Sequence, residues 1–187
     1  MVGYTGGEKE SPTYRSLGDH TEAIQVEFNP EEVSYEELLA AFWSGHDPGG
    51  AVWSRQYMAA VFTHNRRQEA LALASRDRVA AGRKGKVTTA VLPAGTFTPA
   101  EDYHQKYYLR QDSKLMKEYR DLFPDPIDLV RSTAVARVNG YLGGYGTYDD
   151  LKVQLGALGL SPQGEERLKE YVKKTSPRRA GPVPTRP

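Results

Sequence analysis

The stretch PTYRSLGDHTEAIQVEFNP, residues 12–30, decides the fold and holds the first candidate for chemistry. Apolar side chains alternate at Ile24, Val26 and Phe28, so the pattern predicts a strand from Glu22 to Phe28 with these residues on one face. Glu22 has the same parity, which points its carboxylate toward the apolar side, at the mouth of the core. A carboxylate in that place loses hydration and holds a proton near neutral pH, so Glu22 is a candidate general acid.

Strands and helices alternate from this stretch onward. Ser34 and Glu37 form a capping-box pattern that predicts one helix start, and Asn65 predicts the start of a longer helix. Thr98 and Glu101 predict a third helix start, since a proline follows Thr98 in the first turn. The predicted strands are 22–28, 56–63 and 86–92, and the predicted helices are 34–46, 65–81 and 98–110. This order predicts an α/β fold in the form of an α+β two-layer sandwich.

The character of the chain changes after residue 112. Short helices are predicted there, over 113–122, 127–139, 148–158 and 164–174, with a glycine-aromatic loop at 140–146. We therefore expect a first domain at 1–112, a helical carboxy-terminal extension at 113–174 and a disordered tail at 175–187, which is rich in proline and arginine.

The composition bounds the class of protein. The 187 residues are enough for a real hydrophobic core, and the formal charge of +1 gives no argument for binding nucleic acid or an anionic membrane. No apolar run approaches the roughly 20 residues that span a bilayer, and no signal peptide is recognisable. The sequence contains no cysteine, which excludes disulfides and thiolate metal sites from this chain. We expect a cytoplasmic protein without a cofactor.

Seven short motifs in the first 110 residues carry a resemblance to a known family. They are GYTGG at 3–7, PTY at 12–14, HTE at 20–22, NP at 29–30, FW with HDP at 42–48, and RQYM at 55–58, followed by FTPAEDYHQKYY at 97–108. In order and spacing they resemble the peptide methionine sulfoxide reductase A family. The resemblance implies a ferredoxin-like core, and activity as a peptide-methionine (S)-S-oxide reductase that repairs oxidised proteins.

The resemblance also assigns roles to single residues. It implies that Glu22 protonates the sulfoxide oxygen, that Tyr14 donates a hydroxyl to it, and that Tyr57 belongs to the same pocket. The plainer alternatives are an acid at a strand edge that faces solvent, a loop tyrosine and an ordinary strand aromatic. His20 either orients Glu22, as part of substrate binding, or caps the loop. Trp53 either lines the substrate pocket or packs in the core.

The family uses a cysteine in a Gly-Cys-Phe-Trp-Gly turn, whose thiolate attacks the sulfoxide sulfur. This chain has no such turn, so we expect an amino-terminally shortened form that lacks the first strand and helix and is itself inactive. The implied partners are methionine sulfoxide, free or in peptides, and thioredoxin as the reductant of the complete enzyme. The alternative is a non-catalytic module, derived from the reductase, that binds a sulfoxide or a protein.

Two further clusters have structural interpretations. His46 and the Asp-Pro pair after it are typical of a helix end. Glu101 and Asp102 are favourable at a helix start, and although His104 lies near them, the sequence offers no further ligands for a metal.

Overall fold

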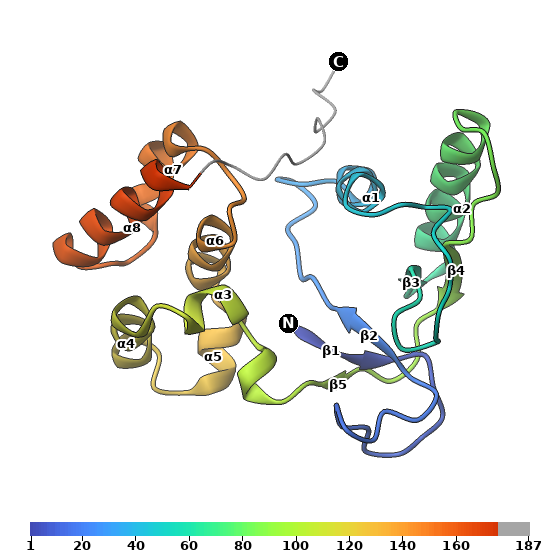
Figure 1. Cartoon of the computed structure of the whole chain (residues 1–187), viewed down its shortest axis with the longest axis horizontal. Helices are drawn as coiled ribbons and strands as arrows, with labels where there is room; N and C mark the ends of the chain where they lie inside the picture. Colours follow the sequence, from blue (N-terminus) through green and yellow to red (C-terminus); the bar gives the residue numbers. More distant parts are fainter. Residues whose placement is uncertain (176–187) are drawn as a thin grey trace. The chain divides into compact units, whose positions relative to one another are not determined.

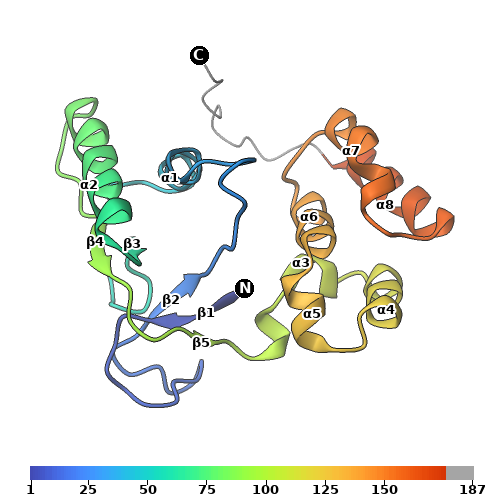
Figure 2. The ribbon, with the colours of Figure 1, turned by 180° about the vertical axis from the view of Figure 1, so that it is seen from behind.

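The computed structural model describes residues 1–175, which form two compact units (Figures 1 and 2). The α/β unit is Val2–Glu101, and the helical unit consists of Met1 and the residues from Asp102 onward. The chain thus has a mixed α/β fold with a helical carboxy-terminal region, as the sequence predicts. The expected disordered tail lies outside the described residues, apart from Thr175.

An antiparallel sheet of three strands in the order β2-β1-β5 organises the first part of the α/β unit (Figure 1). Its central strand β1, Val2–Thr5, lies between β2, Thr21–Ile24, and β5, Thr98–Pro99. The sequence predicted no strand before residue 22, because the glycines there are typical of turns, so β1 was missed. Gly3 instead permits close packing, since a Cβ atom at this position would lie 2.4 Å from both Phe97 Cζ and the Thr98 carbonyl oxygen.

The second part of the α/β unit is a parallel pair of strands with two helices. Strand β3, Ala60–Thr63, pairs with β4, Ala90–Pro93, and α2, Arg66–Ala81, forms the crossover between them. Helix α1, Tyr35–Ser44, packs on α2, where Trp43 Nε1 donates to Ser75 Oγ over 2.9 Å. The predicted capping box of Ser34 and the cap at Asn65 are both confirmed.

The helix predicted from Thr98 was wrong in its first half. Thr98 pairs with Tyr4 across β5 and β1, and only a short 3₁₀ turn η1, Asp102–His104, and helix α3, Tyr107–Arg110, follow. The Glu101 side chain, expected in a capping box, is instead hydrogen-bonded to Tyr4. Long-range pairing of the sheet therefore overrides a local helix signal.

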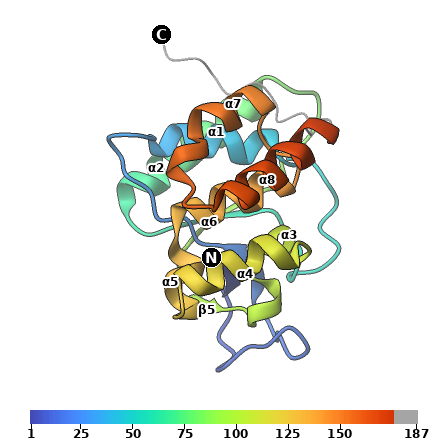
Figure 3. The ribbon, with the colours of Figure 1, turned by 90° about the vertical axis from the view of Figure 1, so that its left-hand side faces the viewer.

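The helical unit continues with α4, Ser113–Leu122; α5, Pro126–Arg131; α6, Thr133–Leu142; α7, Tyr148–Gln154; the 3₁₀ turn η2, Leu155–Ala157; and α8, Pro162–Lys174 (Figure 3). The predicted helix 127–139 is two helices, because Ser132 is extended with ψ 127° and serves as the carboxy-terminal cap of α5 and the amino-terminal cap of α6. The predicted loop 140–146 begins only after Leu142.

The two units differ in how much apolar surface they bury. In the helical unit the buried core is continuous and is built from α3 to α8. In the described part of the α/β unit a small cluster of Tyr4, Leu17 and Ala100 is buried, with Val2 packed against it. The candidate site lies beside this cluster.

Candidate functional site

Glu22 lies on the exposed face of β2, opposite Tyr4 of β1. The expectation that it points into a core with Ile24 and Val26 was wrong, since those side chains are 72% and 52% exposed. Leu17 packs over this face of the sheet at Tyr4, but within the described residues nothing buries the part over β2. The strand also ends at Ile24 rather than at residue 28.

The segment Arg55–Tyr57 lies against β2 and supplies the partners of Glu22. The Glu22 N–H donates to the Gln56 carbonyl oxygen over 3.0 Å, and Thr21 Oγ1 donates to the Arg55 carbonyl oxygen over 2.9 Å. This docking explains why β3 begins at Ala60 and not at residue 56 as predicted. These two hydrogen bonds therefore hold the segment Arg55–Tyr57 next to Glu22.

Gln56 connects the acid to a phenol. Its Nε2 donates to Glu22 Oε1 over 2.8 Å and to Tyr57 Oη over 2.9 Å, which uses both protons of the amide. In a strand, Gln56 and Tyr57 would point to opposite faces, but outside a strand both side chains reach the same place. We call Glu22, Gln56, Tyr57 and Tyr14 the acid–phenol cluster.

Tyr14 completes the acid–phenol cluster from a distant loop. Its hydroxyl forms a hydrogen bond with Tyr57, and this bond raises the pKa of the Tyr57 phenol because it favours the protonated form. Tyr14 and Tyr57 are 42% and 62% exposed, so the cluster is open to a ligand. All four side chains come from the α/β unit.

The loop that carries Tyr14 is held by two side chains that follow it. The Asp19 carboxylate accepts from the backbone N–H groups of Glu8 and Lys9, and these bonds, that of Glu8 first, lower the pKa of Asp19. His20 is buried, and its Nδ1 accepts from the Gly7 N–H over 3.3 Å. Its Nε2 then donates to the Lys9 carbonyl oxygen over 2.8 Å, so both ring nitrogens are used within the loop.

The remaining predicted site residue, Trp53, is 90% exposed in the loop before the docked segment. Neither the contact of Trp53 nor that of His20 with a substrate is tested by this geometry, and both stay predictions. The geometry thus brings together three of the five predicted residues, Glu22, Tyr14 and Tyr57.

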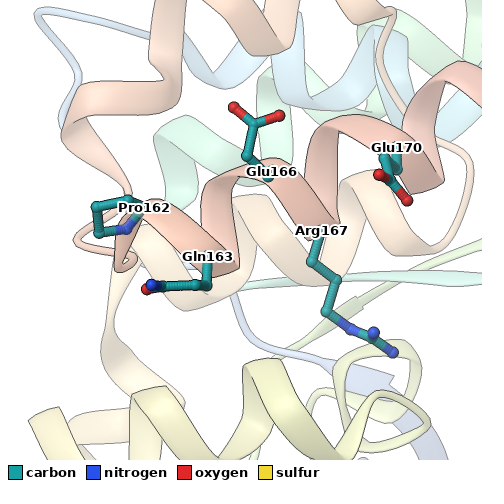
Figure 4. A pocket seen from close by; sticks show the side chains of 5 residues that line it. All are labelled: Pro162, Gln163, Glu166, Arg167 and Glu170. Carbon is teal, nitrogen blue, oxygen red and sulfur yellow. The ribbon is translucent and has the colours of Figure 1, made fainter.

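Two other parts of the described structure do not form a site. Within residues 1–175, no three His, Asp or Glu side chains gather as a metal site would require. In the helical unit, a hollow runs along one side of α8, lined by Pro162, Gln163, Glu166, Arg167 and Glu170 (Figure 4). Arg167 is already paired with Asp112 over 2.6 Å, and the other side chains do not converge on one point.

The family model described as peptide methionine sulfoxide reductase matches residues 1–125. The chain belongs to this family. A second model, described as the helical domain of selenoprotein methionine sulfoxide reductase A, matches residues 126–173 and thus most of the helical unit of this reductase-family chain.

Individual curated proteins that are similar to this chain carry the name of the same family. The chain is 36% identical over 163 residues to a peptide methionine sulfoxide reductase of Drosophila melanogaster, covering 86% of this chain and 65% of that protein. It is 38% identical over 146 residues to peptide methionine sulfoxide reductase A5 of Oryza sativa, covering 75% and 57%. The structure of Mxr1 from Saccharomyces cerevisiae in reduced form is similar with a TM-score of 0.55 and 28% identity, covering 60% of this chain and 70% of that one.

The chain spans less than two thirds of the length of these two curated relatives, 65% and 57%. Among the described residues, no helix is both long enough and apolar enough to cross a membrane.

Two residues that touch the predicted site were missed as functional candidates. Gln56 belongs to the RQYM motif at 55–58, but in the strand predicted over 56–63 its side chain would point to the face opposite to that of Tyr57. Glu101 was interpreted as a helix-start acid, although its carboxylate contacts the backbone of Tyr14. A motif match could have named both residues, but only tertiary contacts reveal what they touch.

Proposed function

We propose that the acid–phenol cluster binds the oxygen of methionine sulfoxide and supplies the proton that this oxygen needs when the sulfur is reduced. The observation that carries the proposal is the Gln56 amide, which joins Glu22 Oε1 to Tyr57 Oη. Since a sulfoxide oxygen is a strong acceptor without protons of its own, it requires a group of donors that converge on one point.

The members of the acid–phenol cluster differ in how they hold or donate a proton. Gln56 donates to Oε1 of Glu22, so a proton on the acid resides on Oε2, from which it can reach a ligand. Tyr57 stays protonated at neutral pH, because the ordinary pKa of a phenol is 10.0 and the bond with Tyr14 raises it further.

The family reaction requires a thiolate that attacks the sulfoxide sulfur. The oxygen passes to the cysteine as a sulfenic acid, methionine leaves as a thioether, and a second thiol reduces the sulfenic acid. This chain contains no cysteine. We therefore propose that the chain by itself binds the sulfoxide without reducing it, and that reduction uses a thiol that these 187 residues do not contain. Thioredoxin as the reductant and the cytoplasm as the location are parts of the same proposal.

Binding is tested by nuclear magnetic resonance on the whole chain with N-acetyl-methionine sulfoxide methylamide. We expect saturable shifts of the Gln56 side-chain amide at millimolar ligand, and much smaller shifts with the thioether, which lacks the oxygen. Glu22→Gln and Tyr57→Phe should weaken binding, whereas Glu27→Gln, an exposed acid outside the cluster, should not. Equal shifts with sulfoxide and thioether would contradict the proposal.

Reduction is tested separately with dithiothreitol and the same sulfoxide. Formation of the thioether above the blank rate would show that the chain is active without a cysteine, and would overturn the second half of the proposal. Sulfoxide binding without turnover is the expected result.

A further inference from the structure

Glu101 joins three segments of the α/β unit that are far apart in the sequence. Its Oε2 accepts a hydrogen bond of 2.6 Å from the Tyr4 hydroxyl, and its Oε1 accepts one of 3.0 Å from the Tyr14 N–H. The two partners lie 97 and 87 residues away in the chain. Each oxygen of this carboxylate therefore holds a different segment.

The carboxylate itself is firmly placed. Glu101 follows β5, and the Ala100 N–H before it donates to the Val2 carbonyl oxygen over 3.0 Å. Tyr4 is only 2% exposed and lies in the buried cluster with Leu17. Hydrogen bonds to a carboxylate are short and about twice as strong as neutral ones, so this pair forms a rigid anchor.

Tyr14, in contrast, sits where a chain is usually mobile. Thr13 and Ser16 exchange two backbone hydrogen bonds of 3.3 and 3.0 Å, which places Tyr14 at the tip of a tight turn. Tips of exposed turns move easily unless other contacts hold them. The Glu101 carboxylate, which accepts from the Tyr14 N–H, ties this tip to the sheet.

We propose that Glu101 is a positioning residue, which fixes the backbone of Tyr14 so that its hydroxyl stays beside Tyr57 in the acid–phenol cluster. The inference rests on the proposed function for its role in sulfoxide binding, but the positioning itself can be measured without a ligand. Glu101 touches neither the ligand nor the reacting atoms. It acts through Tyr14, and Tyr4 keeps it in place.

The first measurement is hydrogen exchange at the Tyr14 amide. In Glu101→Ala, exchange should become about tenfold faster or more, the factor expected for losing a hydrogen bond to a charged acceptor. Glu101→Gln should retain much of the protection, because its amide oxygen can accept from Tyr14 while its NH₂ donates to Tyr4 Oη. Glu10→Ala, an exposed acid of the same loop, is the matched control and should leave the exchange unchanged.

The second measurement separates positioning from a general loosening of the fold. If Tyr14 moves away from Tyr57, the pKa of the Tyr57 phenol should fall in Glu101→Ala, as read from its ring signals in a pH titration, and should recover in Glu101→Gln. Unchanged Tyr14 exchange or an unchanged Tyr57 titration in Glu101→Ala would overturn the inference.

Sulfoxide binding is measured on the same variants. Loss of protection at Tyr14 together with at least a threefold weaker affinity supports the inference. If the unmodified chain binds no sulfoxide while Tyr14 still loosens in Glu101→Ala, the proposed function fails and the structural contact stands. If the unmodified chain binds and Glu101→Ala binds equally well, the positioning role fails alone.

Discussion

Two tyrosine hydroxyls in the α/β unit, that of the buried Tyr4 and that of the half-buried Tyr35, allow a sharp test of the packing near the site. The Tyr4 hydroxyl donates to Glu101 over 2.6 Å, whereas the buried Tyr35 hydroxyl has no hydrogen-bond partner among the described residues. In each case, substitution by phenylalanine removes one oxygen atom and leaves the ring in place. The two variants therefore differ in whether the lost hydroxyl had a partner.

The expected magnitudes follow from this difference. A hydrogen bond to a charged acceptor contributes about 1.5–3 kcal/mol, and because Glu101 is only half-buried we expect a loss of about 1–2 kcal/mol in Tyr4→Phe. Tyr35→Phe should change the free energy of unfolding by less than about 0.5 kcal/mol or should stabilise the unit, since it removes a desolvated group. Burial also raises the pKa of the Tyr35 phenol, as expected for that environment.

Urea unfolding followed by tryptophan fluorescence measures the relevant unit. Both tryptophans of the chain, Trp43 and Trp53, lie in the α/β unit, so their signal does not report on the helical unit. Midpoints and slopes then give the free energy of unfolding of the α/β unit. Equal stability of Tyr4→Phe and the unmodified chain, or equal losses in the two variants, would refute the reasoning. A cycle with Glu101→Ala, which removes the acceptor, should show that the effects of Tyr4 and Glu101 are not additive.

Three further predictions concern the loop, the cluster and the helical core. Tyr14→Phe should lower the pKa of Tyr57 toward its ordinary value, as an ultraviolet titration of the phenols would detect. The depressed pKa of folded Asp19 means that its carboxylate stabilises the loop fully above the ordinary value of 3.8 and loses this effect as the pH falls through the lowered value. The exchange protection factors of the Glu8 and Lys9 amides, taken relative to the unfolded chain at the same pH, should therefore fall in acid. Tyr119→Phe should cost the helical unit about 1–3 kcal/mol in thermal unfolding followed by circular dichroism, since its buried hydroxyl donates to the Leu158 carbonyl oxygen over 2.8 Å; an unchanged midpoint would contradict it.

Local signals predicted the helices well. The cap residues Ser34 and Asn65 begin helices where expected, because their side chains bond to backbone N–H groups only three residues ahead. Ser132 shows the limit of this reasoning, since it caps both neighbouring helices and divides a segment that the sequence presents as one. These cap hydrogen bonds join residues that are close together in the chain, and for that reason the sequence alone can predict them.

The sequence predicted strand boundaries and side-chain directions less well than helices. Apolar alternation placed Glu22 on an inward face, but alternation only says which residues share a face and not what covers it. Strand β1 was not predicted, because its glycines are typical of turns. Its pairing depends on residues about 20 and 95 positions away.

The sequence by itself determined the family, the helical carboxy-terminal region and three members of the acid–phenol cluster. Only the tertiary structure brought Gln56 between Glu22 and Tyr57 and set Glu101 beneath Tyr14. The physical reason is that these contacts join residues 34 and 87 positions apart in the chain, and their geometry depends on the docking of loops on the sheet. No local pattern of residue types encodes such docking, because it is decided by the packing of the whole α/β unit.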